Sequence, residues 1–250
     1  MIKILSIIFL VLLIIVGKKQ GLKTYICFYL NYILILSYIL FMAFGFNAII
    51  VSIITCLIAS LITLFLINGN NIKTRSSFVS ICFVLIIMFV IVFLIGKNAN
   101  IQGFSLESIE TIGLYSYDIN YNMTDVIIGM ILVCTIGTII DTSISISTSL
   151  NEVYINNTNI SEKELYNSGM NIGKDILSTT INTLFFAFLG GIIAFFFWHY
   201  SESFEYIINY KVLVQEIVEL LCCCIGSILV IPITSYITSL NLIKTGSKVD

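Results

Sequence analysis

The chain has 250 residues, of which 58% are hydrophobic and only 10% are charged, and its mean hydropathy is +1.06. A soluble domain carries about 25% charged residues, so this composition excludes a soluble globular protein and indicates an integral membrane protein. The formal net charge is −2 and no basic run occurs, which argues against a nucleic-acid partner.

The apolar runs are continuous rather than alternating, which predicts membrane-spanning helices and not a β-barrel. The predicted fold is an all-α, polytopic membrane bundle, a single membrane domain over residues 1–250 with about seven spans. In chain order the spans are expected at about 2–17, 24–44, 46–68, 78–96, 124–148, 175–198 and 214–240. No small-residue cleavage site follows the first run, so we interpret it as a retained span and not as a signal peptide.

Lysine and arginine residues concentrate on one side of this predicted topology. The connections after the first, third, fifth and seventh spans hold nine of them: Lys18, Lys19, Lys23, Lys73, Arg75, Lys163, Lys174, Lys244 and Lys248. The other side holds three, which are Lys3, Lys97 and Lys211. The positive-inside rule therefore predicts an outer N-terminus and a cytoplasmic C-terminus. Segment 97–123 then lies outside, and segment 149–173 is a cytoplasmic linker in which Ser161 and Glu164 have capping-box spacing.

The seven cysteines all fall in apolar runs and lack the spacing of a metal or redox site. We interpret them as small hydrophobic side chains packed in the bundle. The single His199 has no nearby pair of cysteines or glutamates, so neither a metal nor a cofactor is expected. One histidine with scattered acids also does not supply the constellation of an enzyme active site, and we expect no enzyme.

Polar residues recur at helical spacing in the last three predicted spans. The fifth span places on one face Thr135, Thr138, Asp141 or Thr142, and Ser145. The sixth shows Asp175, Ser178 or Thr179, and Asn182, with Thr183 adjacent. The seventh begins with Glu216 and Glu219 and continues with Ser227, Thr234 and Thr238. The second to fourth spans offer little beyond Asn31.

Asp141 has two interpretations, because a carboxylate at membrane depth costs roughly 2.5–3.5 kcal/mol on insertion scales. In the first, Asp141 lies near enough to the cytoplasm to be hydrated, and the surrounding serines and threonines hold helices together. In the second, Asp141 takes up and releases a proton while neighbouring threonine and asparagine side chains rearrange. Glu216 and Glu219 are expected near the outer surface, in contact with water.

Three stretches, "SGMNIGKD" (168–175), "TINTL" (180–184) and "IGSILVIPIT" (225–234), follow one another in the order and spacing of a known family. They resemble the YibE/F-like family of bacterial multi-pass membrane proteins. "LFLINGNNIKTRSSFVS" (64–80) is similar to that family's loop after the third span. The resemblance covers nearly the whole chain and is strongest over the core at 124–240. Two residues depart from the pattern: Lys174 stands where arginine is expected, and Glu219 where a basic residue is usual.

The resemblance implies a location in the bacterial inner membrane and a partner. This chain is similar to the half of a two-protein set that lacks an extracytoplasmic domain. Besides the lipid bilayer, the expected partner is a YibE-like membrane protein that bears this domain, or a second copy of the chain.

A weaker similarity links the fifth and sixth spans to SecD/SecF and to the resistance-nodulation-division transporters. In that superfamily a membrane aspartate belongs to a proton relay. Carried over by position, Asp141 is the relay carboxylate, beside Thr138 and Thr142 on its own span. The resemblance makes Thr179, Asn182 and Thr183 its neighbours on the sixth span, and Lys174, Asp175 and Glu216 are secondary candidates.

Two functions are therefore predicted. The first is the membrane subunit of a transporter, proton-coupled through Asp141 and paired with a domain-bearing homologue. The alternative is a non-catalytic membrane scaffold, or a secretion or assembly factor, without transport activity.

Overall fold

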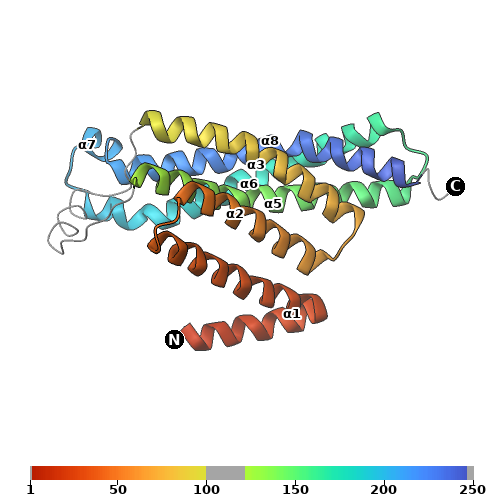
Figure 1. Cartoon of the computed structure of the whole chain (residues 1–250), viewed down its shortest axis with the longest axis horizontal. Helices are drawn as coiled ribbons and strands as arrows, with labels where there is room; N and C mark the ends of the chain where they lie inside the picture. The colour runs from red at the N-terminus through yellow and green to blue at the C-terminus, as the bar shows by residue number, and fades with distance from the viewer. Residues whose placement is uncertain (1, 100–121, 247–250) are drawn as a thin grey trace.

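The computed structural model describes residues 2–99 and 122–246, and every element in these ranges is a helix. In chain order they are α1 (Ile2–Ala43), α2 (Ala48–Leu61), the π-helix η1 (Ile62–Leu66), α3 (Ile72–Ala99), α5 (Met123–Asn156), α6 (Glu162–Trp198), the short α7 (Phe204–Ile208) and α8 (Lys211–Gly246), drawn in Figure 1. The predicted all-α bundle is confirmed for this part of the chain. Residues 100–121 of the predicted outer loop lie outside the described residues.

The first two predicted spans form one element, α1, which reverses direction at Lys18. This residue has a φ of 48° and a ψ of −125°, a backbone conformation that is uncommon for residues other than glycine. Gly21 permits the reversal, because a Cβ at this position would overlap the backbone oxygen of Leu13. The two arms then lie side by side, and Ser6 Oγ is 2.8 Å from Tyr29 Oη.

The two arms of α1 form one continuous element, so the number of candidate spans depends on whether α1 is counted once or twice. Six described helices are long and apolar enough, with α1 counted once, whereas the sequence suggests about seven spans. The first arm, residues 2–17, is about 24 Å long at 1.5 Å per residue. That length falls short of the hydrocarbon core of a bilayer, which is about 30 Å thick.

The connections alternate between the two ends of the bundle. The reversal in α1, residues 67–71, residues 157–161 and the end of α8 lie at one end, and the turn at 44–47 and α7 lie at the other (Figure 1). The start of α1 and the end of α8 also lie at opposite ends (Figure 1). This arrangement gathers the basic connections at one end, as the sequence suggests. Which side of the membrane that end faces stays a prediction.

Most of the predicted linker 149–173 is helical, because α5 continues to Asn156 and α6 begins at Glu162. Ser161 is the N-cap of α6, as its spacing to Glu164 predicts. Its Oγ accepts a hydrogen bond from the Glu164 backbone N–H at 3.3 Å, and the Glu164 carboxylate accepts one from the Ser161 backbone N–H at 3.0 Å. This reciprocal pair is the predicted capping box.

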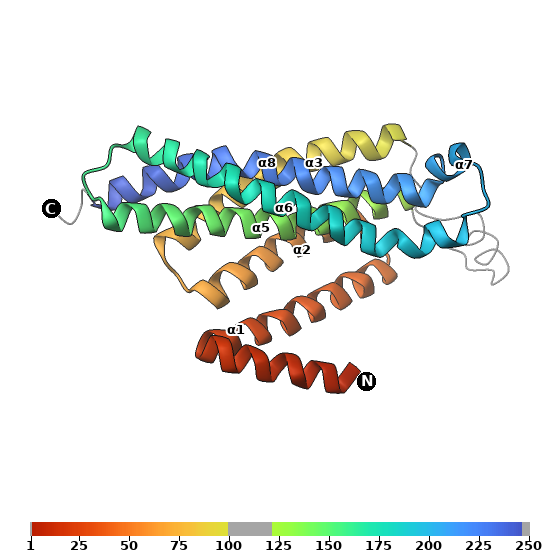
Figure 2. The same cartoon turned by 180° about the vertical axis from the view of Figure 1, so that it is seen from behind.

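Helices α3, α5 and α8 pack against one another at the centre of the bundle (Figures 1 and 2). Their core is aliphatic over much of its length and includes fully buried Val84 and Met88 of α3, Ile128 and Ile131 of α5, and Val230 of α8. Helix α1 contacts α2 and η1, where Asn31 Nδ2 donates a hydrogen bond to Thr63 Oγ1 at 3.1 Å. The N-terminal elements therefore lie at the edge of the bundle.

Helix α6 approaches the centre through two glycines one turn apart. A Cβ on Gly173 would overlap the side chain of Ile231, and one on Gly169 would lie 2.7 Å from Ser235 Oγ and 3.0 Å from Leu150 Cδ1. Small residues at these positions let two helix backbones approach closely, as is common in membrane bundles. These glycines hold the N-terminal part of α6 close to α8 and α5.

Candidate functional site

A set of buried hydroxyl side chains lies where α3, α5 and α8 meet, and each member is at most 1% exposed. We call this set the hydroxyl cluster. It consists of Thr74, Ser76, Ser77 and Ser80 of α3, Thr142, Ser143 and Ser147 of α5, and Thr234, Ser235, Thr238 and Ser239 of α8. Such a concentration of polar side chains is unusual in a core that is otherwise aliphatic.

Hydrogen bonds join the three helices within the hydroxyl cluster. Ser77 Oγ and Ser147 Oγ are 2.6 Å apart, and Ser143 Oγ lies 3.0 Å from Thr234 Oγ1. At its edge, Asn241 Nδ2 donates to Ser76 Oγ at 2.9 Å. Each helix is therefore linked to another by side-chain bonds, so this part of the bundle is fixed by polar as well as apolar contacts.

Four hydroxyls of the cluster are buried without a hydrogen-bond partner among the described residues: those of Thr74, Thr142, Ser235 and Thr238. A buried polar group without a partner costs about 1–3 kcal/mol, so most such groups in proteins are paired. The cluster therefore contains both strong interhelical bonds and unused hydrogen-bonding capacity.

Asp141 lies outside this cluster, although it immediately precedes Thr142. It is exposed on the surface of the bundle, whereas Thr142 is 1% exposed, because successive residues of a helix point about 100° apart. No hydrogen bond or ion pair joins Asp141 to another residue within 2–99 and 122–246. The candidate relay carboxylate thus faces out of its own chain.

The polar face predicted for the fifth span divides into two. Thr135 and Thr142 point inward, Asp141 and Ser145 point outward, and Thr138 is half-buried between them. The Thr138 hydroxyl donates to the Thr135 carbonyl at 2.9 Å and lies 3.5 Å from the Cys223 carbonyl of α8. The expectation of a single stripe along α5 is therefore wrong.

The candidates on α6 are exposed as well. Thr179, Asn182 and Thr183 all lie on the surface, and the two threonine hydroxyls donate to carbonyls of their own helix, at 2.8 and 2.9 Å. The contact between Leu150 and Gly169 sets the register of the antiparallel pair and puts Asp141 level with Ser178. The structure brings these candidates to one level of α5 and α6, without a hydrogen bond between them.

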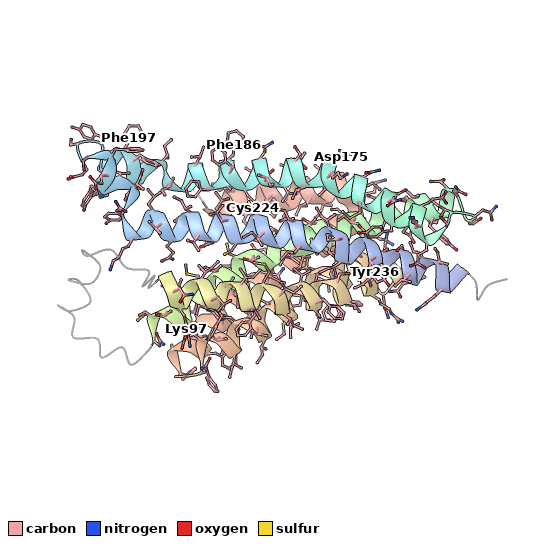
Figure 3. All side chains as sticks on the ribbon, turned by 90° about the horizontal axis from the view of Figure 1, so that it is seen from above. Lys97, Asp175, Phe186, Phe197, Cys224 and Tyr236 are labelled. Atoms are coloured by element: carbon pink, nitrogen blue, oxygen red, sulfur yellow. The ribbon has the colours of Figure 1, made fainter. Side chains whose placement is uncertain are left out.

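The three secondary candidates are also exposed: Lys174 and Asp175 on α6, and Glu216 near the start of α8. None of them forms an ion pair within the described ranges. Figure 3 shows α6, with Asp175, Phe186 and Phe197 labelled, lying along α8, with Cys224 and Tyr236. Phe186 and Phe197 are 70% and 74% exposed, so α6 presents aromatic as well as polar side chains to its surroundings.

The hydroxyls of α3 are a part of the candidate site that the sequence analysis missed. They form the motif "TRSSFVS", Thr74 to Ser80, which precedes or only reaches the predicted fourth span at 78–96. Because α3 begins at Ile72, this motif is helical and lies inside the bundle. The hydroxyl residues of this motif recur at intervals of three and four positions, and this helical spacing could have identified a buried polar face. Within the described part of the chain, no three His, Cys, Asp or Glu side chains come together as a metal site requires.

Long apolar helices, an aliphatic core and a buried polar cluster together define a polytopic helical membrane protein. A family model described as YibE/F-like protein matches residues 5–244. The chain therefore belongs to the YibE/F-like family. Searches of curated proteins and of solved structures gave no match, so the similarity to SecD/SecF stays a hypothesis.

Proposed function

We propose that this chain is the membrane subunit of a bacterial transporter, coupled to proton movement through Asp141 and completed by a second membrane protein. The observation that carries the proposal is the outward position of Asp141, without a partner among the described residues. Asp141 lies about 27 Å along α5 from Met123 and about 22 Å before Asn156, at 1.5 Å per residue. The carboxylate is therefore far from both helix ends.

A carboxylate in that position needs a polar environment, since exposure to hydrocarbon costs roughly 2.5–3.5 kcal/mol. Asp141 and Ser145 of α5, with Thr179, Asn182 and Thr183 of α6, form an exposed set that we call the polar face. Contact with another polytopic chain would supply hydrogen bonds to this face. The family resemblance makes a homologue with an extracytoplasmic domain the proposed partner.

The partner is tested by photo-crosslinking in native membranes. A photo-reactive amino acid in place of Ser145 or Asn182 is expected to capture one membrane protein, identified by mass spectrometry. The matched control is Val79, which is exposed on α3 and belongs to neither α5 nor α6. If the photo-reactive amino acid at position 79 captured as much protein as at positions 145 and 182, or if only lipid adducts formed, a partner at the polar face would be contradicted.

Proton coupling is tested on the purified complex in liposomes, with an internal pH-sensitive dye and an imposed membrane potential. Asp141→Asn keeps the size of the side chain but removes its exchangeable charge, and proton flux is expected to fall to the level of empty liposomes. Glu152→Gln is the control, because it removes an exposed carboxylate from α5 that is not among the relay candidates. Full flux in Asp141→Asn would exclude this aspartate as the relay.

A scaffold is the second candidate function, and the hydroxyl cluster favours it. Its bonds between Ser77 and Ser147 and between Ser143 and Thr234 link three helices and need no transported substrate to explain them. Under this alternative, the complex forms and carries no proton flux in any variant. The crosslinking and flux experiments together therefore distinguish the two functions.

A further inference from the structure

A polar hollow lies at the start of α3, at the end of the bundle that gathers the basic connections. Its volume is about 540 Å³, and it is lined by Asn70, Asn71, Ile72, Lys73, Arg75 and Asn151. These residues come from the connection before α3, from its first turn and from the last turns of α5. Five of the six lining side chains can donate hydrogen bonds.

The donors of this hollow are largely unused. Arg75 Nε donates to Asn70 Oδ1 at 2.7 Å, which holds the guanidinium in place, and Asn71 Nδ2 donates to the Asn68 carbonyl at 3.0 Å. The Lys73 ammonium and the Asn151 amide have no partner among the described residues. Lys73 and Asn151 are partly exposed, whereas Asn70, Asn71 and Arg75 are exposed, so the hollow is open to a ligand from outside.

The electrostatics of the hollow favour an anion. Two cationic side chains and no carboxylate line it, and no acidic residue occupies the first turn of α3. The N-terminal end of a helix also carries a partial positive charge that stabilises an anion there. Several nitrogen donors around a cationic pair are the recognition chemistry of a phosphate group.

The position of the hollow points to a lipid as the source of the phosphate. Lys73 and Arg75 immediately precede the long apolar stretch of α3, one of the candidate membrane spans. Basic pockets between membrane helices bind the headgroups of anionic lipids in this way. We propose that the hollow binds the phosphate headgroup of an anionic phospholipid.

This binding would act on the hydroxyl cluster through the same helical turns. Lys73 and Arg75 line the hollow, whereas Thr74, Ser76 and Ser77 between and after them are buried in the cluster. A headgroup that fixes the first turn of α3 therefore also fixes the helix that carries these hydroxyls. Bound lipid is expected to raise the thermal stability of the whole chain, because a ligand that binds only the folded state stabilises it.

The test titrates the full-length protein in neutral detergent with short-chain phosphatidylglycerol and follows its thermal unfolding. Tm is expected to rise with phosphatidylglycerol and not with phosphatidylcholine of the same chain length. Lys73→Gln and Arg75→Gln are each expected to raise about tenfold the phosphatidylglycerol concentration needed for a given Tm shift, because each variant loses one charge-assisted hydrogen bond. Lys163→Gln, at an exposed basic residue of the same end, is the control.

Glycerol 3-phosphate and inorganic phosphate distinguish the two sources of the anion. If either soluble compound gave the same Tm shift at the same concentration, the ligand of the hollow would be a free phosphate compound and not a lipid. An equal shift with phosphatidylcholine, or an equal loss in Lys163→Gln, would overturn the site itself. Should the Gln variants fail to fold, competition between phosphatidylglycerol and phosphatidylcholine on the wild-type protein, resolved by native mass spectrometry, decides the same question.

Discussion

The hydroxyls of Ser77 in α3 and Ser147 in α5 lie 2.6 Å apart, although 70 positions separate the two residues in the chain. In a double-mutant cycle, Ser77→Ala and Ser147→Ala are expected to show a coupling of about 0.6 kcal/mol, the average for hydrogen bonds between membrane helices. The measurement is reversible unfolding in mixed micelles. Ser80→Ala is the control partner, since Ser80 donates to the Ser76 carbonyl of its own helix and its effect should be additive with Ser147→Ala.

Thr142→Val removes a buried hydroxyl that has no partner among the described residues and keeps the shape of the side chain. The free energy of unfolding is therefore expected to rise by about 1 kcal/mol, since an unsatisfied buried group no longer has to lose its hydration. Thr135→Val is the comparison, because that hydroxyl donates to the Ile131 carbonyl at 2.6 Å and its loss should not stabilise. A destabilised Thr142→Val protein would mean that this hydroxyl is paired in the membrane.

Gly173→Ala places a methyl group against the side chain of Ile231. Overpacking of this kind costs about 1–3 kcal/mol, and the variant is expected to unfold at lower denaturant concentration. Gly190→Ala is a matched control in the same helix, where a Cβ has no neighbour within 4 Å. That variant should be neutral or slightly more stable, since alanine is the better helix former. Equal behaviour of the two variants would contradict the close contact of α6 with α8.

Ser161→Ala removes the N-cap of α6 and is expected to cost about 1 kcal/mol of stability. Ser168→Ala serves as the control, because Ser168 is partly exposed within α6 and donates only to the Glu164 carbonyl of its own helix. Hydrogen exchange of the first amides of α6 provides the local readout. Faster exchange in both variants, or in neither, would argue against a capping role specific to Ser161.

Local features of the sequence predicted local structure well. The capping box at Ser161 and Glu164 needs only two residues three positions apart, and both of its hydrogen bonds are present. Ser227, Thr234 and Thr238 of α8 are also all buried, as residues that share one face of a helix by their spacing can be. The family assignment depended on short motifs in fixed order, and the family model confirms it over residues 5–244.

The orientation of each helix could not be predicted in the same way. Helical spacing gives the angle between two residues, such as Asp141 and Thr142, but which of them faces the core depends on the helices packed around α5. The buried position of Thr74 depends likewise on α5 and α8, far along the chain. The reversal of α1 depends on Gly21 and on the positive φ of Lys18, which composition does not indicate.

The central position of α8 in the bundle determines when the other helices can complete their packing during synthesis. Helix α8 packs against α3, α5 and α6, so these three cannot complete their contacts until α8 has left the ribosome. Earlier helices must therefore remain in the bilayer, or with an insertion factor, while hydroxyls that bond to α8, such as that of Ser143, still lack that partner. Chains that end before Lys211 are expected to be recognised by membrane quality control and degraded, however well their first helices insert.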